Sequence, residues 1–165
     1  MTTTRTPPWH NPTARERKAI VDGTRTVAIV GMSADPSRAS YFVATYLLSS
    51  SCGYEHIWFV NPRGGEILGQ PVFPTLADLP AVPDLVDVFR RAEDLPGVAR
   101  ETVALGGVRT FWGQLGLMSQ EAVDIAYDAG LDVVMDRCLK IEHARFHGGL
   151  HLAGFDTGVI SSRRS

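Results

Sequence analysis

The sequence predicts an α/β fold: a doubly wound, mostly parallel sheet of five to six strands with helices on both faces. Two observations predict it. Short apolar runs rich in β-branched residues, such as 26–30 and 56–60, are typical of strands buried on both faces. Segments with the helical spacing of apolar residues separate these runs, and such alternation favours a parallel sheet of the Rossmann-like class.

The first twelve residues predict no regular element. Residues 1–12 are scattered Thr and Pro without an apolar run, so we expect a flexible arm and not a secretory signal. A helix is predicted over 13–22, because Thr13 and Glu16 have the spacing of a capping box. Gly23 would end it.

A strand–helix–strand unit follows. The first strand, 26–30, ends at Gly31, and the second, 56–60, stops at Asn61-Pro62. Between them, 37–51 has helical spacing, with Phe42, Tyr46 and Leu47 on one side.

The rest of the chain continues the alternation. We expect a short extended piece at 71–73, a helical turn at 76–79, strands at 85–89, 110–112 and 133–135, and helices at 95–105, 119–129 and 139–146. The aromatic side chains expected in the core are Phe42, Trp58, Phe111 and Trp112, of which Trp112 could instead form a wall of a pocket.

Size and composition fit one domain, placed at 13–150, with a tail at 151–165. The chain has 165 residues, of which 44% are hydrophobic, and a formal net charge of −2, which disfavours a general nucleic-acid binder. Its apolar stretches are far shorter than the roughly 20 residues that a membrane helix needs, so no membrane span is expected. Cys52 and Cys138 lack metal-ligand spacing, and a cytoplasmic location is the expectation.

Arginines gather where a ligand would bind. Residues 26–162 contain nine basic and sixteen acidic side chains. Five of the nine basic residues directly follow predicted strands: Arg38, Arg63, Arg90, Arg91 and Arg137. In a parallel sheet these positions share one edge, where ligands bind. Converging guanidinium groups, with a helix N-terminus after Gly31, indicate a ligand with several phosphates, although single loop arginines are often only solvated.

The first loop narrows the choice of ligand. NAD is disfavoured, because the loop after Gly31 lacks the G-x-G-x-x-G pattern and the second strand is not followed by a carboxylate. NADP and coenzyme A both remain, since Arg63 could bind a ribose phosphate. A Walker-type loop does not occur, which argues against a P-loop NTPase.

Five ordered segments carry a resemblance to a known family: VAIVGMSADPSRAS, FVNPRGGEILGQPVFPTLADLP, PDLVDVFRRAED, FWGQLGL and VVMDRCLKIEHAR. The chain resembles the stand-alone CoA-binding proteins, whose domain is similar to the CoA-binding domain of the succinyl-CoA synthetase alpha subunit. The resemblance covers roughly residues 14–147. The synthetase's phosphorylated histidine belongs to a further domain that does not follow here, so ligase activity is not expected.

The resemblance implies coenzyme A as the ligand and a set of residues around it. It implies that the phosphates and pantetheine face Gly31, Met32, Ser33, Pro36, Arg38 and Ser40. It implies that the adenosine end lies by Asn61, Pro62 and Arg63. It implies further that Phe89 and Arg90 border the cofactor, that Gln114, Leu115 and Gly116 shape its channel, and that Met135, Arg137 and Cys138 approach from the last strand.

A serine, a histidine pair and a cysteine each have a chemical and a structural explanation. Ser33 lacks the second glycine of a nucleophile elbow and is interpreted as a phosphate-facing hydroxyl. His143 and His147 have the i, i+4 spacing of a zinc pair but are better explained as surface or packing histidines. Cys138, between Arg137 and Lys140, could form a mixed disulfide with coenzyme A, although a buried inert thiol is the simpler explanation.

Three functions remain open. We expect a binding module for CoA or acyl-CoA without catalysis of its own. The alternative is an NADP-dependent or acyl-CoA-processing enzyme using the same site, with Asp136, Glu142 and His143 as acid–base groups. A third interpretation is a homo-oligomer or an interaction subunit that docks a partner through the basic arm formed by 15–18 and Arg25.

Overall fold

The computed structural model describes residues 5–49 and 51–147, and strands and helices alternate through it. The strands are β1 (Thr26–Val30), β2 (His56–Val60), β3 (Glu66–Ile67), β4 (Gln70–Phe73), β5 (Leu85–Val88), β6 (Thr110–Gly113) and β7 (Asp132–Val134). The helices are α1 (Ala14–Gly23), α2 (Ala39–Leu47), α3 (Leu95–Leu105), α4 (Gln120–Asp128) and α5 (Leu139–Phe146), with 3-10 turns at Leu76–Asp78 and Ala92–Asp94. The tail expected at 151–165 lies outside the described residues.

One sheet of seven strands forms the middle layer, in the order β3-β4-β2-β1-β5-β6-β7. Every pair is parallel except β3 and β4, which form an antiparallel hairpin at the edge. The α/β class and the mostly parallel sheet are as predicted, but the count of five to six strands was too low. The missed strand is β3, whose two residues follow Gly64-Gly65 and carry too little pattern to be recognised.

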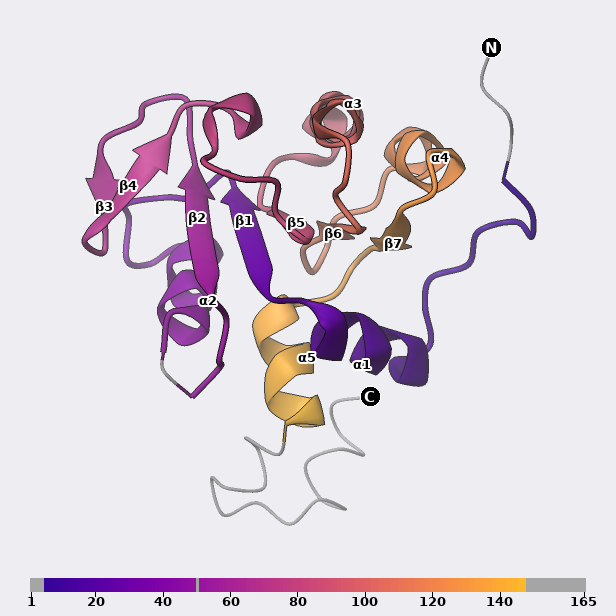
Figure 1. Cartoon of the computed structure of the whole chain (residues 1–165), viewed down its shortest axis with the longest axis horizontal. Helices are drawn as coiled ribbons and strands as arrows, with labels where there is room; N and C mark the ends of the chain where they lie inside the picture. The colour runs from indigo at the N-terminus through magenta and orange to yellow at the C-terminus, as the bar shows by residue number, and fades with distance from the viewer. Residues whose placement is uncertain (1–4, 50, 148–165) are drawn as a thin grey trace.

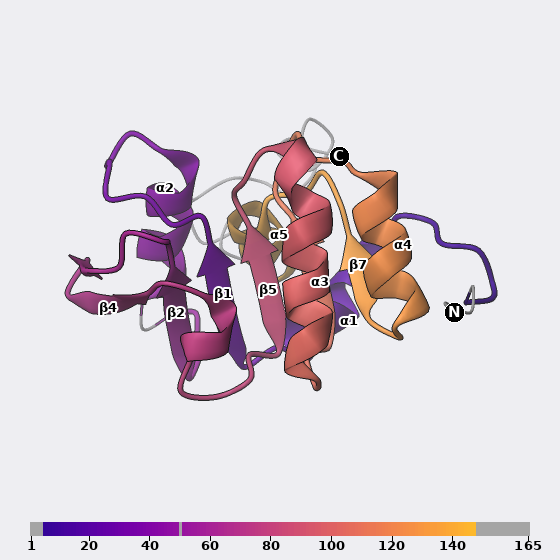
Figure 2. The same cartoon turned by 90° about the horizontal axis from the view of Figure 1, so that it is seen from above.

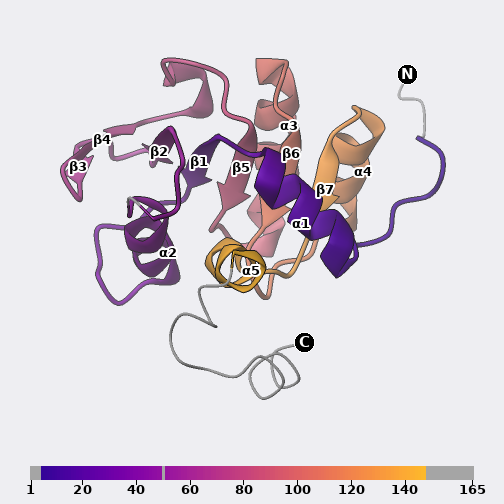
Figure 3. The ribbon, with the colours of Figure 1, turned by 60° about the horizontal axis from the view of Figure 1, so that its bottom comes forward.

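Helices cover both faces of the sheet (Figure 1). Helices α3 and α4 lie on one face, where Ala28, Val86 and Phe111 belong to the buried core. Figure 3 shows α1, α2 and α5 on the opposite face, where Ile29 and Trp112 belong to a second core. Because side chains alternate along a strand, each central strand supplies both cores, which is why it reads as an unbroken apolar run.

Two of the four aromatic side chains expected in the core, Phe42 and Trp58, are not fully buried. Phe42 is 56% exposed, which contradicts the prediction, whereas Phe111 and Trp112 are fully buried. The buried face of α2 is formed by Ser40, Val43, Ala44 and Leu47, and Phe42 projects from the opposite side of the helix. Trp58 is half-buried and stacks on His56, with ring centroids 5.1 Å apart.

The N-terminal segment binds along the edge strand, unlike the flexible arm expected at 1–12. Trp9 Nε1 donates to the carbonyl of Val133 at 2.9 Å. Asn11 bonds Met135 twice, donating to its carbonyl at 2.8 Å and accepting from its N–H at 3.0 Å. An edge strand has unpaired backbone groups, and these side chains satisfy them. Residues 1–4 lie outside the described part.

The helix after this segment is capped as predicted. Thr13 accepts from the Glu16 N–H, and the Glu16 carboxylate accepts from the Thr13 N–H at 2.8 Å. None of the helices within residues 5–49 and 51–147 combines the length and hydropathy needed to cross a bilayer.

Candidate functional site

The loops that leave the parallel strands begin side by side (Figure 2). In the sheet register Val30 is the neighbour of Val60 and Val88, and Val88 is the neighbour of Gly113. The segments after these residues therefore share the carboxyl edge of the sheet, as the sequence predicts. We refer to this edge as the rim.

Gly31 makes the sharp turn after β1. Its φ is +88°, and its N–H donates to the carbonyl of Val60 at 3.0 Å. A β-carbon there would overlap the carbonyl oxygen of Phe89 and come 2.9 Å from Arg90 Cδ. The loop after β1 lies directly against the loop after β5. Only glycine adopts this φ readily and leaves room for that approach.

The turn leads into the N-terminus of α2. The Ser33 N–H donates to Ser40 Oγ at 3.0 Å, which ties the turn to the first residues of the helix. Arg38 is the N-cap residue and makes no side-chain hydrogen bond to that first turn. The unpaired N–H groups and the positive end of the helix dipole are thus available at the rim, an arrangement suited to an anion.

Asn61 links the second loop to the first. Its Nδ2 donates to the Met32 carbonyl at 2.6 Å, and its Oδ1 accepts from the Arg63 N–H at 2.8 Å. Both polar atoms of the amide are therefore used in fixing the loops. Within the described residues, the exposed Arg63 guanidinium forms no ion pair, so its charge is free for a ligand.

The other rim arginines have carboxylate neighbours. Arg90 lies 3.3 Å from Asp94, and Arg38 lies 3.9 Å from Asp35. Hydrogen bonds from Ser37 lower the pKa of Asp35, with the Arg38 charge a smaller cause. These arginines are held at the rim while much of their surface stays exposed, so they can exchange a carboxylate for a phosphate.

Two cavities adjoin along the rim. One, of about 430 Å³, is lined by Gly31, Met32, Ser33, Arg38, Ala39, Ser40, Asn61, Phe89, Arg90, Gln114, Leu115 and Leu117. The other, of about 600 Å³, is lined by residues of the first two loops and the β3 hairpin, including Arg63. They share Ser33, Arg38 and Asn61, so they form one elongated groove.

Eleven of the seventeen residues named from the sequence line this groove, and six do not: Pro36, Pro62, Gly116, Met135, Arg137 and Cys138. Met135 and Cys138 are buried in the core, whereas Arg137 bonds the carbonyl of Asp136 at 2.8 Å. Gly116 donates its N–H to Asp136 Oδ1 at 2.7 Å, which joins the β6 and β7 loops. These six positions do not form the walls of either cavity.

A family model described as a CoA binding domain matches residues 25–144. The chain belongs to the CoA-binding domain family. That match begins just before β1, ends within α5 and includes every element of the rim, and it leaves out α1 and the N-terminal segment. The resemblance stated from the sequence is thereby confirmed.

Relatives of this CoA-binding domain are similar over nearly their whole length. The uncharacterized protein YneT of Bacillus subtilis is 39% identical over 134 residues, covering 81% of this chain and 96% of the relative. A hypothetical protein from Pyrococcus horikoshii has a TM-score of 0.78 at 31% identity, covering 90% of this chain and all of that one. A Thermus thermophilus structure has a TM-score of 0.74 at 35% identity, covering 82% and 99%.

A larger enzyme has the same fold in one part. An acetyl-coenzyme A synthetase from Ca. Korarchaeum cryptofilum has a TM-score of 0.57 at 23% identity, over 66% of this chain and 25% of that chain. This likeness shows the fold of the CoA-binding domain and nothing further about its activity.

Sequence reasoning missed several residues of the CoA-binding domain. The residues that line the groove but were not predicted to do so are Ala34, Asp35, Ala39, Leu117 and the segment 64–67. Asp87 is a different kind of omission: it lies in the middle of β5 and is fully buried, and neither carboxylate oxygen has a hydrogen-bond partner in the part of the chain that the structure describes. Burial raises the pKa of Asp87 well above its usual range. The signal was visible, since an acid in the apolar run LVDVF is unusual.

The histidine pair is explained by packing. The rings of His143 and His147 stack with centroids 4.4 Å apart, and the Tyr46 hydroxyl lies 2.9 Å from His143 Nδ1. Burial, followed by the charge of His147, lowers the pKa of His143. Within residues 5–49 and 51–147, no group of His, Cys, Asp and Glu side chains could hold a metal ion.

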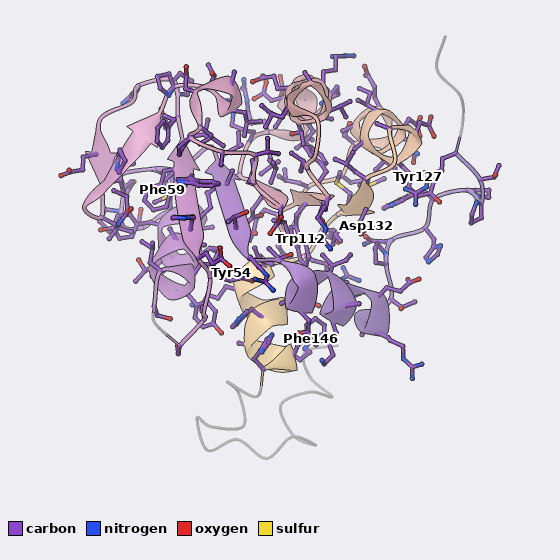
Figure 4. The ribbon with its side chains drawn as sticks, in the orientation of Figure 1. Tyr54, Phe59, Trp112, Tyr127, Asp132 and Phe146 are labelled. Carbon is purple, nitrogen blue, oxygen red and sulfur yellow. The ribbon has the colours of Figure 1, made fainter. Side chains whose placement is uncertain are left out.

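Two other cavities lie away from the rim. One, of about 440 Å³, includes Tyr127 and Asp132 beside the N-terminal segment, and the other, of about 500 Å³, includes Tyr54 and Phe146 near α5. Figure 4 labels these four side chains. The first contains two arginines, Arg5 and Arg109, against three acids, Glu16, Asp84 and Asp132. An excess of acidic over arginine side chains does not suit a polyphosphate. In the rim groove arginines outnumber acidic side chains.

Proposed function

We propose that this chain is a binding module that holds coenzyme A or a CoA thioester in the rim groove and has no catalytic activity of its own. The observation that carries the proposal is the pair of adjoining cavities that share Ser33, Arg38 and Asn61. Coenzyme A is a long ligand with a phosphorylated nucleoside at one end and a thiol at the other, and an elongated groove is suited to it.

The charge along the groove supports phosphate binding. The Gly31 turn and the α2 N-terminus offer backbone N–H groups, and Arg38 and Arg90 line the same cavity. Arg63 lines the neighbouring cavity. In this proposal the pyrophosphate binds at the turn, and the ribose phosphate binds Arg63.

The titratable groups of the groove support binding without chemistry. Among the described residues that line it, the ionisable side chains are Asp35, Glu66 and arginines, and histidine, lysine and cysteine are lacking. The lowered pKa of Asp35 makes it a poor proton acceptor at neutral pH. Asp136, Glu142 and His143, the acid–base groups of the enzyme alternative, do not line the groove.

Calorimetry on the purified full chain tests the proposal. We expect CoA to bind with a dissociation constant in the micromolar range or below, and NADP to bind at least about tenfold more weakly. Native mass spectrometry of the untreated protein should show a CoA-sized adduct. A dissociation constant for CoA above about 1 mM, or tighter binding of NADP, would overturn the assignment.

A further inference from the structure

Gln114 has a buried carboxamide that makes no hydrogen bond to any other residue of 5–49 and 51–147. The residue is 8% exposed, and its Oε1 is shielded from water and accepts no hydrogen bond. No hydrogen bond of its Nε2 occurs within the described residues either. The backbone is fixed, because the Gln114 N–H donates to the Val88 carbonyl at 3.2 Å and its carbonyl accepts from Leu117 N–H at 2.9 Å.

An unpaired buried amide is unusual in a folded protein. Leaving a buried acceptor without a donor destabilises the folded state, and most buried polar side chains have a partner. Here the residue lines the 430 Å³ cavity beside Phe89 and Leu115, which have apolar side chains and offer it none. A ligand group that enters the cavity can supply this partner once the carboxamide turns toward it.

The position of Gln114 in the groove limits what that partner can be. Gln114, Leu115 and Leu117 line the 430 Å³ cavity and not its neighbour, so they lie away from Arg63. Leu115 is 59% exposed and is the first residue after Gln114 in the turn. This end of the groove thus combines apolar surface with one amide that can donate and accept.

We propose that Gln114 is a specificity-determining residue that hydrogen-bonds an amide of the pantetheine arm. The inference rests on the proposed binding of CoA. A secondary amide has one N–H and one C=O, which complement the carbonyl and amino groups of a carboxamide. Rotation about the last side-chain bond of Gln114 presents either group, and the Leu115 side chain covers the apolar part of the arm.

Adenine is the other fragment of CoA that a carboxamide can bind, through its N6 amino group and a ring nitrogen. If Gln114 bound adenine, the phosphates would run through the groove in the reverse direction. The two arrangements make opposite predictions for a nucleotide that lacks pantetheine, so one experiment separates them.

The experiment compares CoA with adenosine 3′,5′-bisphosphate by calorimetry. In Gln114→Met, a side chain of similar length, we expect CoA to bind about 5- to 30-fold more weakly, the loss of one or two hydrogen bonds. The affinity for adenosine 3′,5′-bisphosphate should change less than about twofold. Gln120→Met is the matched control, because Gln120 is exposed on α4 and its amide bonds Asp124.

Two results would overturn the proposal. If Gln114→Met lost affinity equally for CoA and for adenosine 3′,5′-bisphosphate, Gln114 would bind adenine. If Gln114→Met and Gln120→Met bound CoA equally well, Gln114 would not contact CoA. A thermal melt shows that the variant folds, and its melting temperature should match or exceed that of the unaltered protein, because an unpaired polar group has been removed from the interior. If the unaltered protein binds no CoA, the proposed function itself fails.

Discussion

The carbonyl oxygen of Phe89 occupies the space that a β-carbon on Gly31 would need. This contact joins the loops after β1 and β5, which the sheet register brings together at adjacent strand ends. The rim therefore depends on one residue that lacks a side chain.

Gly31→Ala should lower both stability and CoA affinity. Alanine at a φ of +88° costs about 1–2 kcal/mol, and the overlap with Phe89 adds to it by forcing the two loops apart. We expect a loss above about 2 kcal/mol in urea unfolding and loss of CoA binding. Gly130→Ala is the control, because Gly130 has a φ of +96° but open space around it. Equal stability of the two variants would disprove the role of the overlap.

Arg63→Ala should reduce the affinity for CoA more than that for dephospho-CoA. Arg63 forms no ion pair within the described residues, and we assign it the ribose phosphate. Calorimetry should show about a tenfold loss for CoA and less than about twofold for dephospho-CoA. Arg91→Ala is the control, since Arg91 is also exposed but pairs with Asp94 and lines neither cavity. If Arg91→Ala weakened CoA binding as much, general charge at the rim would explain the effect.

Much of the rim could be predicted because it follows from strand ends alone. Gly31, Asn61 and Arg90 come directly after or close to apolar runs that the sequence marks clearly, and a parallel sheet places such positions together. Met135 and Cys138 occupy the same kind of position after β7 but turn into the core. Side-chain direction at a strand end depends on the packing of the next helix, which a sequence pattern does not specify.

Asn11→Ala tests the attachment of the N-terminal segment to β7. The variant leaves both the N–H and the carbonyl of Met135 without their partner. We expect a loss of about 1–3 kcal/mol in the free energy of unfolding, with CoA affinity unchanged. His10→Ala should leave the free energy of unfolding nearly unchanged, because His10 is exposed and its one ion pair among the described residues is with the exposed Glu16. Equal effects of the two variants would mean that the edge contact is not stabilising.

The buried Asp87 should make the protein less stable as the pH rises. Because burial raises its pKa, the folded protein keeps a proton on Asp87 at pH values where the unfolded chain has lost it. Between the ordinary pKa near 4 and the raised value, the free energy of unfolding therefore falls by about 1.4 kcal/mol for each pH unit from this group. In Asp87→Asn the side chain is neutral at every pH and this dependence disappears.

Melting curves from pH 5 to 8.5 measure the effect as the difference between Asp87→Asn and the unaltered protein. That comparison cancels the opposite contribution of His143, whose lowered pKa reduces stability as the pH falls. We expect the melting temperature of the variant, relative to that of the unaltered protein, to rise progressively from pH 5 upward. Asp124→Asn, a change on the surface of α4, should follow the unaltered protein throughout. If the difference in melting temperature stayed constant across the pH range, the Asp87 carboxyl would be ionised in the folded protein. The prediction that burial keeps it protonated would then be wrong.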